Sequence, residues 1–440
     1  MPSGEPARDT IAAVATPPGR GGIGIVRISG PRVTRIAEQI IGSLPPPRAA
    51  TFARFRDARG EAIDEGIALY FPAPHSYTGE EVLELHGHGG PVVMRMLLAA
   101  CLDAGARLAE PGEFTRRAFL EGRLDLAQAE AVADLIDAAS QEAARSAVRS
   151  LSGEFSAAID ALRGALVELR ALTEAQLDFP EEELDGVHRD ATAERLARVQ
   201  AALEDVLSRS RQGSLLRSGV HVVLAGAPNV GKSSLLNRLA GEERAIVTPI
   251  PGTTRDALRE TIHIEGVAVV LVDTAGLRES TDELERMGIA RTQSELVRAD
   301  VVLAVHDATS SEGPLQAFPQ GNPRIDVYNK VDLKPGFTPP QGAVAVSAKT
   351  GQGMVELRDA IVEAAGWSST GESTFLARER HLRALASAKA HLARAGTEHG
   401  RWELFAEELR LAHEALSSIT GAFTADDLLG EIFGRFCIGK

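Results

Sequence analysis

Hydrophobic residues near the N-terminus occur in short runs separated by turn-forming residues. The runs at 24–28, 68–71 and 82–85 are rich in aliphatic and aromatic residues, which predicts strands, and the apolar segment 91–104 predicts a helix. Clusters of Gly, Pro and Ser between them predict turns. These patterns together predict a small α+β domain over residues 1–123.

The hydrophobic period becomes helical after residue 123. Ala, Leu, Glu and Arg dominate residues 124–215, where Leu196, Val199 and Leu203 recur at intervals of three or four. The same composition returns over residues 370–440. Both segments are therefore predicted to be helical.

Residues 216–369 alternate apolar runs with helical stretches. This alternation is typical of a parallel sheet with crossover helices. Because helical sequence flanks the segment on both sides, the simplest architecture packs the flanks together and inserts the α/β domain between them. Two separate helical bundles are the alternative. The predicted strands of this sheet are the apolar runs 220–225, 267–272, 301–305 and 343–346.

Composition narrows the class of protein. A chain of 440 residues exceeds what one hydrophobic core usually holds, so several domains are expected. The net charge of -14 argues against a protein that coats nucleic acid through bulk charge, so any contact with RNA is expected to be local. Two cysteines exclude a disulfide framework, and no stretch has the length and apolarity of a membrane span or signal peptide. A cytoplasmic protein is predicted.

A phosphate-binding motif lies between a predicted strand and a predicted helix. Residues 226–233 have the pattern G-x-x-x-x-G-K-S, follow the run 220–225 and precede a helix from Ser234. In this setting backbone N–H groups and the helix N-terminus face phosphate oxygens, Lys232 reaches the β and γ phosphates, and the Ser233 hydroxyl ligates Mg²⁺. A nucleoside triphosphate site is predicted, in preference to a glycine-rich turn that binds nothing.

Further motifs follow in the order that a G protein needs. The predicted strand 267–272 runs into Asp273-Thr-Ala-Gly276, which supplies a carboxylate on the Mg²⁺ side and a glycine for the γ-phosphate. Asp332 of Asn329-Lys-Val-Asp332 can accept from guanine N1–H and N2–H₂, a donor pattern that adenine lacks. Ala348 of Ser347-Ala-Lys349 can donate its backbone N–H to guanine O6. GTP is therefore the predicted ligand.

One position departs from the small signalling GTPases. They place a water-orienting glutamine directly after this glycine, whereas this chain has Leu277. An apolar side chain cannot orient water, so another polar group must do so. The acidic candidates nearby, each of which is also explained as a solvated helix charge, are Glu279, Asp282, Glu283 and Glu285.

The motifs of the whole chain resemble those of the MnmE (TrmE) family of bacterial tRNA-modification GTPases. The resemblance rests on Thr16-Pro-Pro-Gly-Arg-Gly-Gly-Ile-Gly-Ile-Val-Arg-Ile-Ser-Gly30, Pro111-Gly-Glu-Phe-Thr115, Leu124-Asp-Leu-Ala-Gln-Ala-Glu130 and Phe436-Cys-Ile-Gly-Lys440. It implies a multidomain α/β fold with an α+β N-terminal domain, a helical domain and an inserted P-loop G domain. The domain boundaries expected are 1–123 for the N-terminal domain, 124–215 and 370–440 for the helical domain, and 216–369 for the G domain.

The resemblance also implies a one-carbon chemistry on tRNA. The family's N-terminal domain dimerises and binds 5-formyltetrahydrofolate or a related folate, at positions that match Arg27, Glu84, Arg123 and Lys440. Family members often have Lys where Arg123 stands, which keeps the charge and changes the geometry. With the FAD-dependent partner MnmG, the family adds an aminomethyl or carboxymethylaminomethyl group to C5 of wobble uridine 34 in certain tRNAs.

For hydrolysis, the resemblance implies K⁺-dependent association of two G domains, with K⁺ in place of an arginine finger. The implied K⁺ ligands are Asn229, Thr248, Ile250 and Thr253, and the Mg²⁺ ligands are Ser233 and Thr254. Glu285 matches the family's water-positioning glutamate. The predicted GTP-binding residues are Asn229, Val230, Gly231, Lys232, Ser233, Ser234, Thr248, Thr253, Thr254, Asp273, Thr274, Ala275, Gly276, Asn329, Lys330, Asp332, Ser347, Ala348 and Lys349.

Several interpretations stay open at this point. Cys437 is either a thiol used in the modification or a small residue packed near the folate pocket. His86 and His88 have the spacing of a metal pair without a third ligand, which favours a loop role beside the folate site. The competing functions are a GTP-dependent ribosome-assembly switch and a folate enzyme that GTP merely regulates.

Overall fold

The structure is a computed structural model of the whole chain. It describes residues 9–178, 185–242, 259–273, 294–310, 322–368, 374–398, 401–421, 426–434 and 436–439. The chain divides into two compact units. The first unit contains residues 1–133 and 414–440, and the second contains residues 134–413.

The first unit is built on a six-stranded sheet with the order β3-β4-β5-β2-β1-β6. Strands β1 and β6 pair in parallel, and the other neighbours are antiparallel. The strands are β1 (Ile11–Val14), β2 (Gly21–Ser29), β3 (Thr51–Arg56), β4 (Ala62–Phe71), β5 (Val82–Gly89) and β6 (Arg107–Leu108).

Alternation along the central strands separates a buried face from a polar face. Val26 and Ile28 of β2 are fully buried in a core that includes residues of helices α1 (Val33–Ile41) and α2 (Pro91–Asp103). Because side chains alternate across a strand, the intervening Arg27 points to the opposite face. Its cross-strand partner there is Glu84 of β5. The polar face of the sheet therefore holds an arginine and a glutamate side by side.

The end of the chain belongs to this first unit. Helix α13 (Asp426–Gly434) packs with helices α3 (Glu113–Leu120) and α4 (Leu126–Ile136) in a small apolar cluster. Beyond α13, Ile438 forms a bridge with Pro111, and a Cβ on Gly439 would lie 2.3 Å from the Val14 carbonyl oxygen. The C-terminal segment 436–439 therefore lies between the start of α3 and the end of β1.

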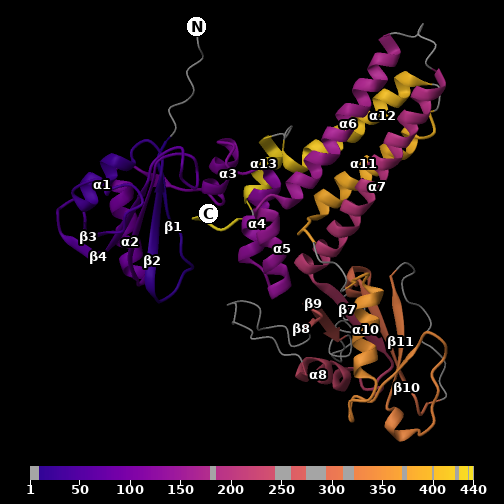
Figure 1. Cartoon of the computed structure of the whole chain (residues 1–440). Coiled ribbons are helices and arrows are strands. Elements are labelled where there is room, and N and C mark those ends of the chain that lie inside the picture. The colour runs from indigo at the N-terminus through magenta and orange to yellow at the C-terminus, as the bar shows by residue number, and fades with distance from the viewer. Residues whose placement is uncertain are drawn as a thin grey trace. The chain divides into compact units, whose positions relative to one another are not determined.

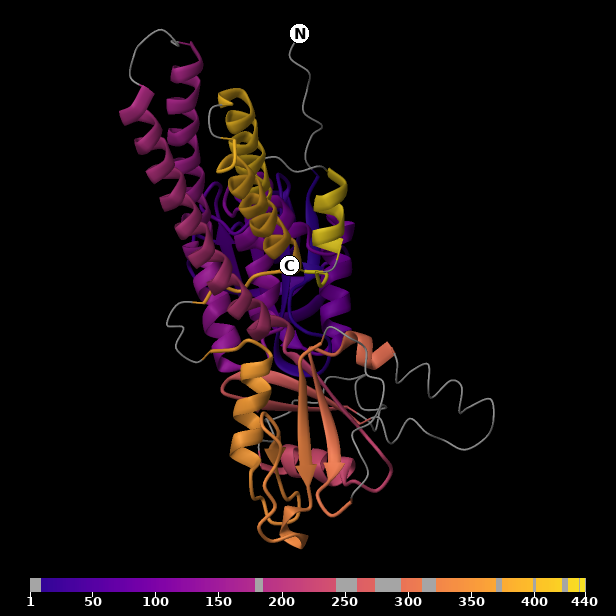
Figure 2. The same cartoon turned by 90° about the vertical axis from the view of Figure 1, so that its right-hand side faces the viewer.

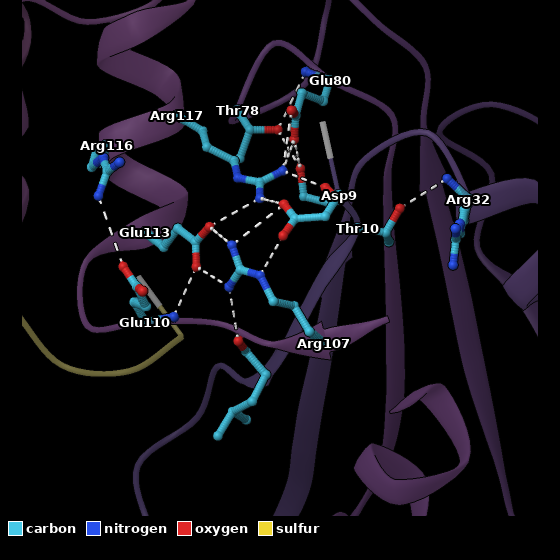
Figure 3. A network of polar contacts seen from close by, with 12 residues as sticks. Asp9, Thr10, Arg32, Thr78, Glu80, Arg107, Glu110, Glu113, Arg116 and Arg117 are labelled. Carbon is cyan, nitrogen blue, oxygen red and sulfur yellow. Dashed lines mark hydrogen bonds and ion pairs between the residues drawn. The ribbon is translucent and has the colours of Figure 1, made fainter. Parts of the chain in front are cut away.

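A network of charged side chains joins α3 to the strands (Figure 3). Glu113 accepts hydrogen bonds from Arg107 at 2.6 and 2.8 Å and from Arg117 at 2.9 Å. Arg117 also donates to Glu80 at 3.0 and 3.2 Å and to the Asp9 carboxylate at 2.8 Å. Burial raises the pKa of the Glu113 carboxyl, but hydrogen bonds from Arg107 and Arg117 outweigh this and hold its pKa below the usual value.

Long helices form one part of the second unit. Helices α6, α7 and α11 run alongside one another (Figures 1 and 2). Glu408 of α12 accepts from His391 of α11 at 2.7 Å, which joins the fourth helix to the group. The helices of this part are α5 (Gln141–Leu151), α6 (Glu154–Asp178), α7 (Asp185–Ser218), α11 (Glu379–Ala395) and α12 (Trp402–Thr420), of which α12 passes into the first unit from Glu414 on.

The other part of the second unit is a six-stranded sheet, most of whose strands are labelled in Figure 1. Its order is β12-β11-β10-β7-β9-β8, and every pair is parallel except β8 with β9. The strands are β7 (Val220–Gly226), β8 (Arg259–Ile264), β9 (Val267–Asp273), β10 (Val301–Asp307), β11 (Arg324–Asn329) and β12 (Val344–Ala345), with helices α8 (Lys232–Glu242) and α10 (Met354–Ala364).

Helices from before and after this sheet pack on one another. Helix α7, which leads into β7, contacts α11, which follows the sheet in sequence. Asp134 at the end of α4 accepts from Arg217 at 2.9 Å and from Arg378 at 2.8 Å, so it holds both connections. The fold class predicted from the sequence, with an inserted α/β domain, is confirmed, and the exact domain boundaries stay a prediction.

The predicted elements are present, and several strands had no clear sequence signal. The helix over 91–104 and the strand candidates at 24–28, 68–71 and 82–85 all correspond to elements of the structure. Strands β1, β3, β6 and β8 were not predicted. None of the described helices has the length and apolarity needed to cross a membrane.

A glycine in α7 tests how tightly the helices pack. A Cβ on Gly213 would lie 1.5 Å from the Phe375 carbonyl oxygen, whereas a Cβ on Gly164 of α6 meets nothing within 4 Å. We expect Gly213→Ala to destabilise the chain by about 1–3 kcal/mol through overpacking. The matched Gly164→Ala should stabilise it by about 0.5–1 kcal/mol through helix propensity. Urea denaturation followed by circular dichroism measures both, and a Gly213→Ala chain as stable as wild type would contradict the packing.

Candidate functional site

The loop between β7 and α8 has the geometry of a phosphate-binding loop. Gly226 ends β7, and a Cβ there would lie 2.4 Å from the Val305 carbonyl oxygen of β10. The residue at this position must therefore lack a side chain. The buried Lys232 begins α8 and donates from Nζ to the Gly226 carbonyl at 3.0 Å and the Ala227 carbonyl at 2.9 Å. The loop thus curls around an ammonium group at a helix N-terminus, an arrangement that suits an anion.

A second pair of side chains meets beside this lysine. Ser233 donates from Oγ to Oδ2 of Asp273 at 2.6 Å. Asp273 is the last residue of β9, which lies next to β7 in the sheet, and its exposed fraction is 5%. A hydroxyl in the first turn of α8 and a carboxylate at the end of β9 are oxygen ligands of the kind that Mg²⁺ takes.

Asn329 ties the phosphate loop to the next loops of the sheet. It ends β11, is 2% exposed, and donates from Nδ2 to the Val230 carbonyl at 3.0 Å. Its Oδ1 accepts from the backbone N–H of Ala348 at 3.1 Å. Gly231 must be a glycine here, because its φ is +93° and a Cβ would lie 2.4 Å from Nδ2 of Asn329. One amide therefore fixes both loops.

Lys330 and Asp332 follow on the same edge of the sheet. Lys330 donates from Nζ to the Asn229 carbonyl at 2.7 Å and to Oδ2 of Asp307 at 2.6 Å. Asp332 accepts at Oδ1 from the Ser347 hydroxyl at 2.7 Å. The structure thus brings together the predicted residues of three separate segments. Asp307 was missed by the sequence analysis, although its place at the end of the buried strand β10 (Val301–Asp307) was a usable signal.

Part of the predicted nucleotide site lies outside the described residues. This applies to Leu277 and to the predicted site residues Thr248, Ile250, Thr253, Thr254, Thr274, Ala275, Gly276 and Glu285. Asn229 is described, and it is an exposed residue with φ +63° in the phosphate loop. Its predicted role in binding K⁺ stays a prediction.

A second candidate site lies on the polar face of the first unit's sheet. Glu84 accepts from Nε of Arg27 at 2.8 Å, and its other oxygen lies 3.1 Å from Nε2 of His86. The Arg27 guanidinium lies 5.3 Å from the Tyr77 ring centre and 5.8 Å from that of Phe114. Among the described residues, the two terminal nitrogens of Arg27 have no hydrogen-bond partner. A guanidinium close to two aromatic rings, with two nitrogens still able to donate hydrogen bonds, suits a planar or carboxylate ligand.

Arg123 lies at the edge of this second candidate site. A Cβ on Gly79 would lie 3.3 Å from Cγ of Arg123, so Arg123 is next to the segment that holds Tyr77. The fourth predicted folate residue, Lys440, is outside the described residues, but Gly439 before it packs against the end of β1. Tyr77 was missed because it lies in a turn-rich segment with no periodicity, whereas Phe114 is part of a motif that supported the resemblance.

The two histidines do not form a metal pair. His86 contacts Glu84, whereas His88 contacts Asp64, 2.8 Å from Nδ1 to Oδ1. No group of three or more His, Cys, Asp or Glu side chains suited to a metal occurs in the part of the chain that the structure describes. The predicted loop role is wrong in one respect, since both histidines lie on strand β5. His86 adjoins the second candidate site.

The two cysteines differ in exposure. Cys101 is fully buried, as predicted, and burial raises the pKa of its thiol to about 12. Cys437 is exposed, so the alternative that its side chain is packed away is wrong. Its carbonyl accepts from the N–H of Gly112 at 3.3 Å, next to Phe114 in sequence. A chemical role for the Cys437 thiol stays a prediction.

Comparison with protein families gives two matches. Residues 10–123 match the model described as GTP-binding protein TrmE N-terminus. Residues 126–437 match the model described as MnmE helical domain. The two matches together span nearly the whole chain.

Comparison with individual proteins agrees with the family models. The chain is 60% identical over 443 residues to the tRNA modification GTPase MnmE of Azoarcus sp. strain BH72, with 98% of each chain covered. It is 58% identical over 441 residues to the protein of that name from Thiobacillus denitrificans, with 99% of each covered. Among solved structures, the FeoB G-domain of Methanococcus jannaschii is 27% identical, and the match covers 33% of this chain and 98% of that one at a TM-score of 0.26.

The bridging amide of Asn329 yields a test of the nucleotide site. In Asn329→Asp the carboxylate loses the donor to the Val230 carbonyl and faces that carbonyl with negative charge. We expect the affinity for GDP to fall roughly 10- to 100-fold, as for a lost buried hydrogen bond. Asn322→Asp is the matched control, because Asn322 makes the same kind of bond to the Leu296 carbonyl away from these loops. Fluorescent-nucleotide titration measures both variants, and equal losses would contradict the bridge.

Proposed function

The chain belongs to the MnmE family of tRNA modification GTPases, and we propose that it hydrolyses GTP at the loop 226–233 to drive a folate-dependent modification of wobble uridine. It is a GTP hydrolase with a role in tRNA modification. The finer steps proposed are the addition of an aminomethyl or carboxymethylaminomethyl group to C5 of uridine 34, with the FAD-dependent partner MnmG and tRNA in one assembly.

The observation that supports this proposal most is the meeting of three strand ends at one edge of a parallel sheet. Lys232 follows β7, Asp273 ends β9, and Asn329 ends β11. In open α/β sheets ligands bind at the carboxyl ends of the strands. Lys232 is proposed to bind the β and γ phosphates, and Asp332 the guanine base. Among the four acids near Leu277, Glu285 is proposed to orient the attacking water.

The residues described fit a Mg²⁺ ion. Ser233 and Asp273 bring a hydroxyl and a carboxylate oxygen within 2.6 Å of each other beside Lys232. Mg²⁺ prefers such oxygen ligands, and when bound it neutralises charge on the phosphates. Ser233 is proposed as a direct ligand, with Thr254 as the ligand that responds to the γ-phosphate.

K⁺ is the proposed activating ion. Asn229 supports this, because it is exposed at a positive φ on the phosphate loop and its carbonyl is held by Lys330. Lys330 binds only the backbone carbonyl of Asn229, so the Asn229 side chain takes no part in that hydrogen bond. K⁺ supplies positive charge between the β and γ phosphates when it is bound. The remaining ligands proposed are Thr248, Ile250 and Thr253.

A folate is the proposed ligand of the second candidate site. Arg27 offers two unused terminal nitrogens close to the rings of Tyr77 and Phe114, and Glu84 offers an acidic partner. Folates combine a planar ring system with carboxylates, so they fit both features. Arg123 and Lys440 are the further proposed contacts. The bound folate would supply the one-carbon unit.

The same sheet face supports a homodimer through the first unit. Phe52 of β3 and Ile67 of β4 are cross-strand partners with exposed fractions of 72% and 42%. Ile67 in turn pairs with His86, beside the proposed folate site. An exposed apolar pair on a sheet face is typical of an interaction site. We include dimerisation there, with transient association of G domains, in the proposal.

Deletion of the gene tests the tRNA reaction. We expect C5-unmodified uridine to accumulate at the wobble position, because no other step would start the addition. Mass spectrometry of digested tRNA measures this. Wild type should restore the modification, and a Lys232→Ala chain, which lacks the phosphate-binding ammonium, should not. Normal modification in the deletion strain would overturn the tRNA function.

The monovalent cation tests the hydrolysis mechanism. We expect the GTPase rate to be on the order of 100-fold higher in KCl than in NaCl, the size of effect that one lost charge-stabilising group has. Phosphate release at equal ionic strength measures the rate, and GTP affinity measured in both salts is the control. Equal rates at saturating GTP would contradict a role for K⁺.

A further inference from the structure

The segment 76–81 forms one wall of the second candidate site and has no regular structure of its own. It lies between β4 and β5 and contains Tyr77, whose ring lies against the Arg27 guanidinium. The other ring, Phe114, comes from α3. Tyr77 and α3 are joined directly, since the Tyr77 hydroxyl lies 2.8 Å from Oγ1 of Thr115. The site at Arg27 thus depends on how this segment sits against α3.

Arg117 is the charged link between the segment and the helix (Figure 3). It lies on α3 and donates to both carboxylate oxygens of Glu80 in the segment. It also donates to Glu113, one turn earlier on α3, and to Asp9 before β1. One guanidinium therefore joins three parts of the first unit, namely α3, the segment 76–81 and the residue before β1.

The buried position of the Arg117 guanidinium does not suit a lysine in its place. The side chains of Arg117, Glu80 and Glu113 are only 11%, 10% and 7% exposed. Burial lowers the pKa of Arg117, but its bonds to Glu113 and Glu80 outweigh this and raise it, so the charge is permanent. Donors in a planar fork match these several acceptors, whereas an ammonium on a flexible stem does not. Lys at this position would keep the charge and lose the geometry.

The network itself has the wrong charge for an anion site. It borders a cavity of about 190 Å³ whose lining includes Asp9, Glu80 and Glu113 besides arginines. Arg107 and Arg117 are already bound to these three carboxylates. The third arginine of the lining, Arg116, is 46% exposed and points to Glu110, so neither guanidinium of the network is left to attract a phosphate or a carboxylate. Its role is therefore to hold other residues in place.

We propose that Arg117 is a positioning residue for the ligand site at Arg27. Through Glu80 it holds the segment 76–81 against α3, and this keeps the rings of Tyr77 and Phe114 beside the Arg27 guanidinium. The inference rests on the proposal that this site binds a folate. It adds a residue that does not touch the ligand and on which the shape of the pocket depends.

Arg117→Lys in the full-length chain tests this, with Arg116→Lys as the matched control. Arg116 is the neighbouring residue on α3, is 46% exposed and has one long contact to Glu110 at 3.8 Å. We expect Arg117→Lys to weaken binding of 5-formyltetrahydrofolate at least tenfold by calorimetry, while Arg116→Lys binds as wild type does. GTPase activity should be unchanged in both, because Arg117 lies in the other unit from the phosphate loop. Wild-type folate affinity in Arg117→Lys would overturn the inference.

Hydrogen exchange gives a measurement that does not need the ligand. Amide exchange in the peptide covering 76–81 should speed up in Arg117→Lys and in Glu80→Gln, and not in Arg116→Lys. Unchanged exchange in both variants would overturn the inference. If wild type binds no folate while exchange responds as expected, the folate proposal fails and the positioning role stands.

A double-variant cycle separates positioning from general loosening. Tyr77→Phe keeps the ring and removes the hydroxyl that meets Thr115. If Arg117 acts through the placement of Tyr77, the Arg117→Lys and Tyr77→Phe double variant loses less affinity than the product of the single losses. Losses that multiply independently would show that Arg117 acts by another route, and would overturn the inference.

Discussion

The architecture of the second unit depends on one buried carboxylate. Asp134, 7% exposed, binds Arg217 at the end of α7, directly before the nucleotide-binding sheet, and Arg378, directly before α11. An inserted domain requires its two connections to lie close together, and a carboxylate with two guanidinium partners satisfies that requirement. Two uncharged hydrogen bonds also hold the segment before α11 against α5. The hydroxyls of Ser146 and Thr374 lie 3.0 Å apart, and the Ser150 hydroxyl accepts from the N–H of Leu376 at 3.0 Å. Removing the Asp134 carboxylate would take away the group that both guanidinium groups share, and breaking such a buried ion pair is costly.

The nucleotide site was predictable because its parts are local in sequence. A parallel sheet brings the carboxyl ends of its strands to one edge. Each motif that follows a buried strand is therefore expected at the site from its position in the sequence alone. Lys232, Asp273 and Asn329 were found in this way. The cross-links between motifs were not predictable. That Asn329 holds both the Val230 carbonyl and the Ala348 N–H depends on the spacing of three loops, and no single segment encodes it.

The site on the first unit could be located from the sequence only through the family resemblance. Arg27, Tyr77 and Phe114 are far apart in the chain and share no periodic pattern. They meet because antiparallel pairing of β2 with β5 puts Arg27 beside Glu84, and because the charged network sets α3 against the segment 76–81. Strands β1 and β3 were not predicted, for a related reason. They are short, and their register depends on partners distant in sequence.

Helix α4 contributes residues to both compact units, since the boundary between them falls after Ala133. Leu126 and Ala129 near its start belong to the apolar cluster with Phe433, whereas Leu135 near its end packs against the core of the nucleotide-binding sheet. Asp134 lies on the same helix, between these two anchors. A displacement of α7 at Arg217 would therefore reach Asp134 through an ion pair, and the same carboxylate would pass it to Arg378 before α11. Coupling of this kind needs an element with two arrangements, and within the second unit Asp134 is the group that both connections share.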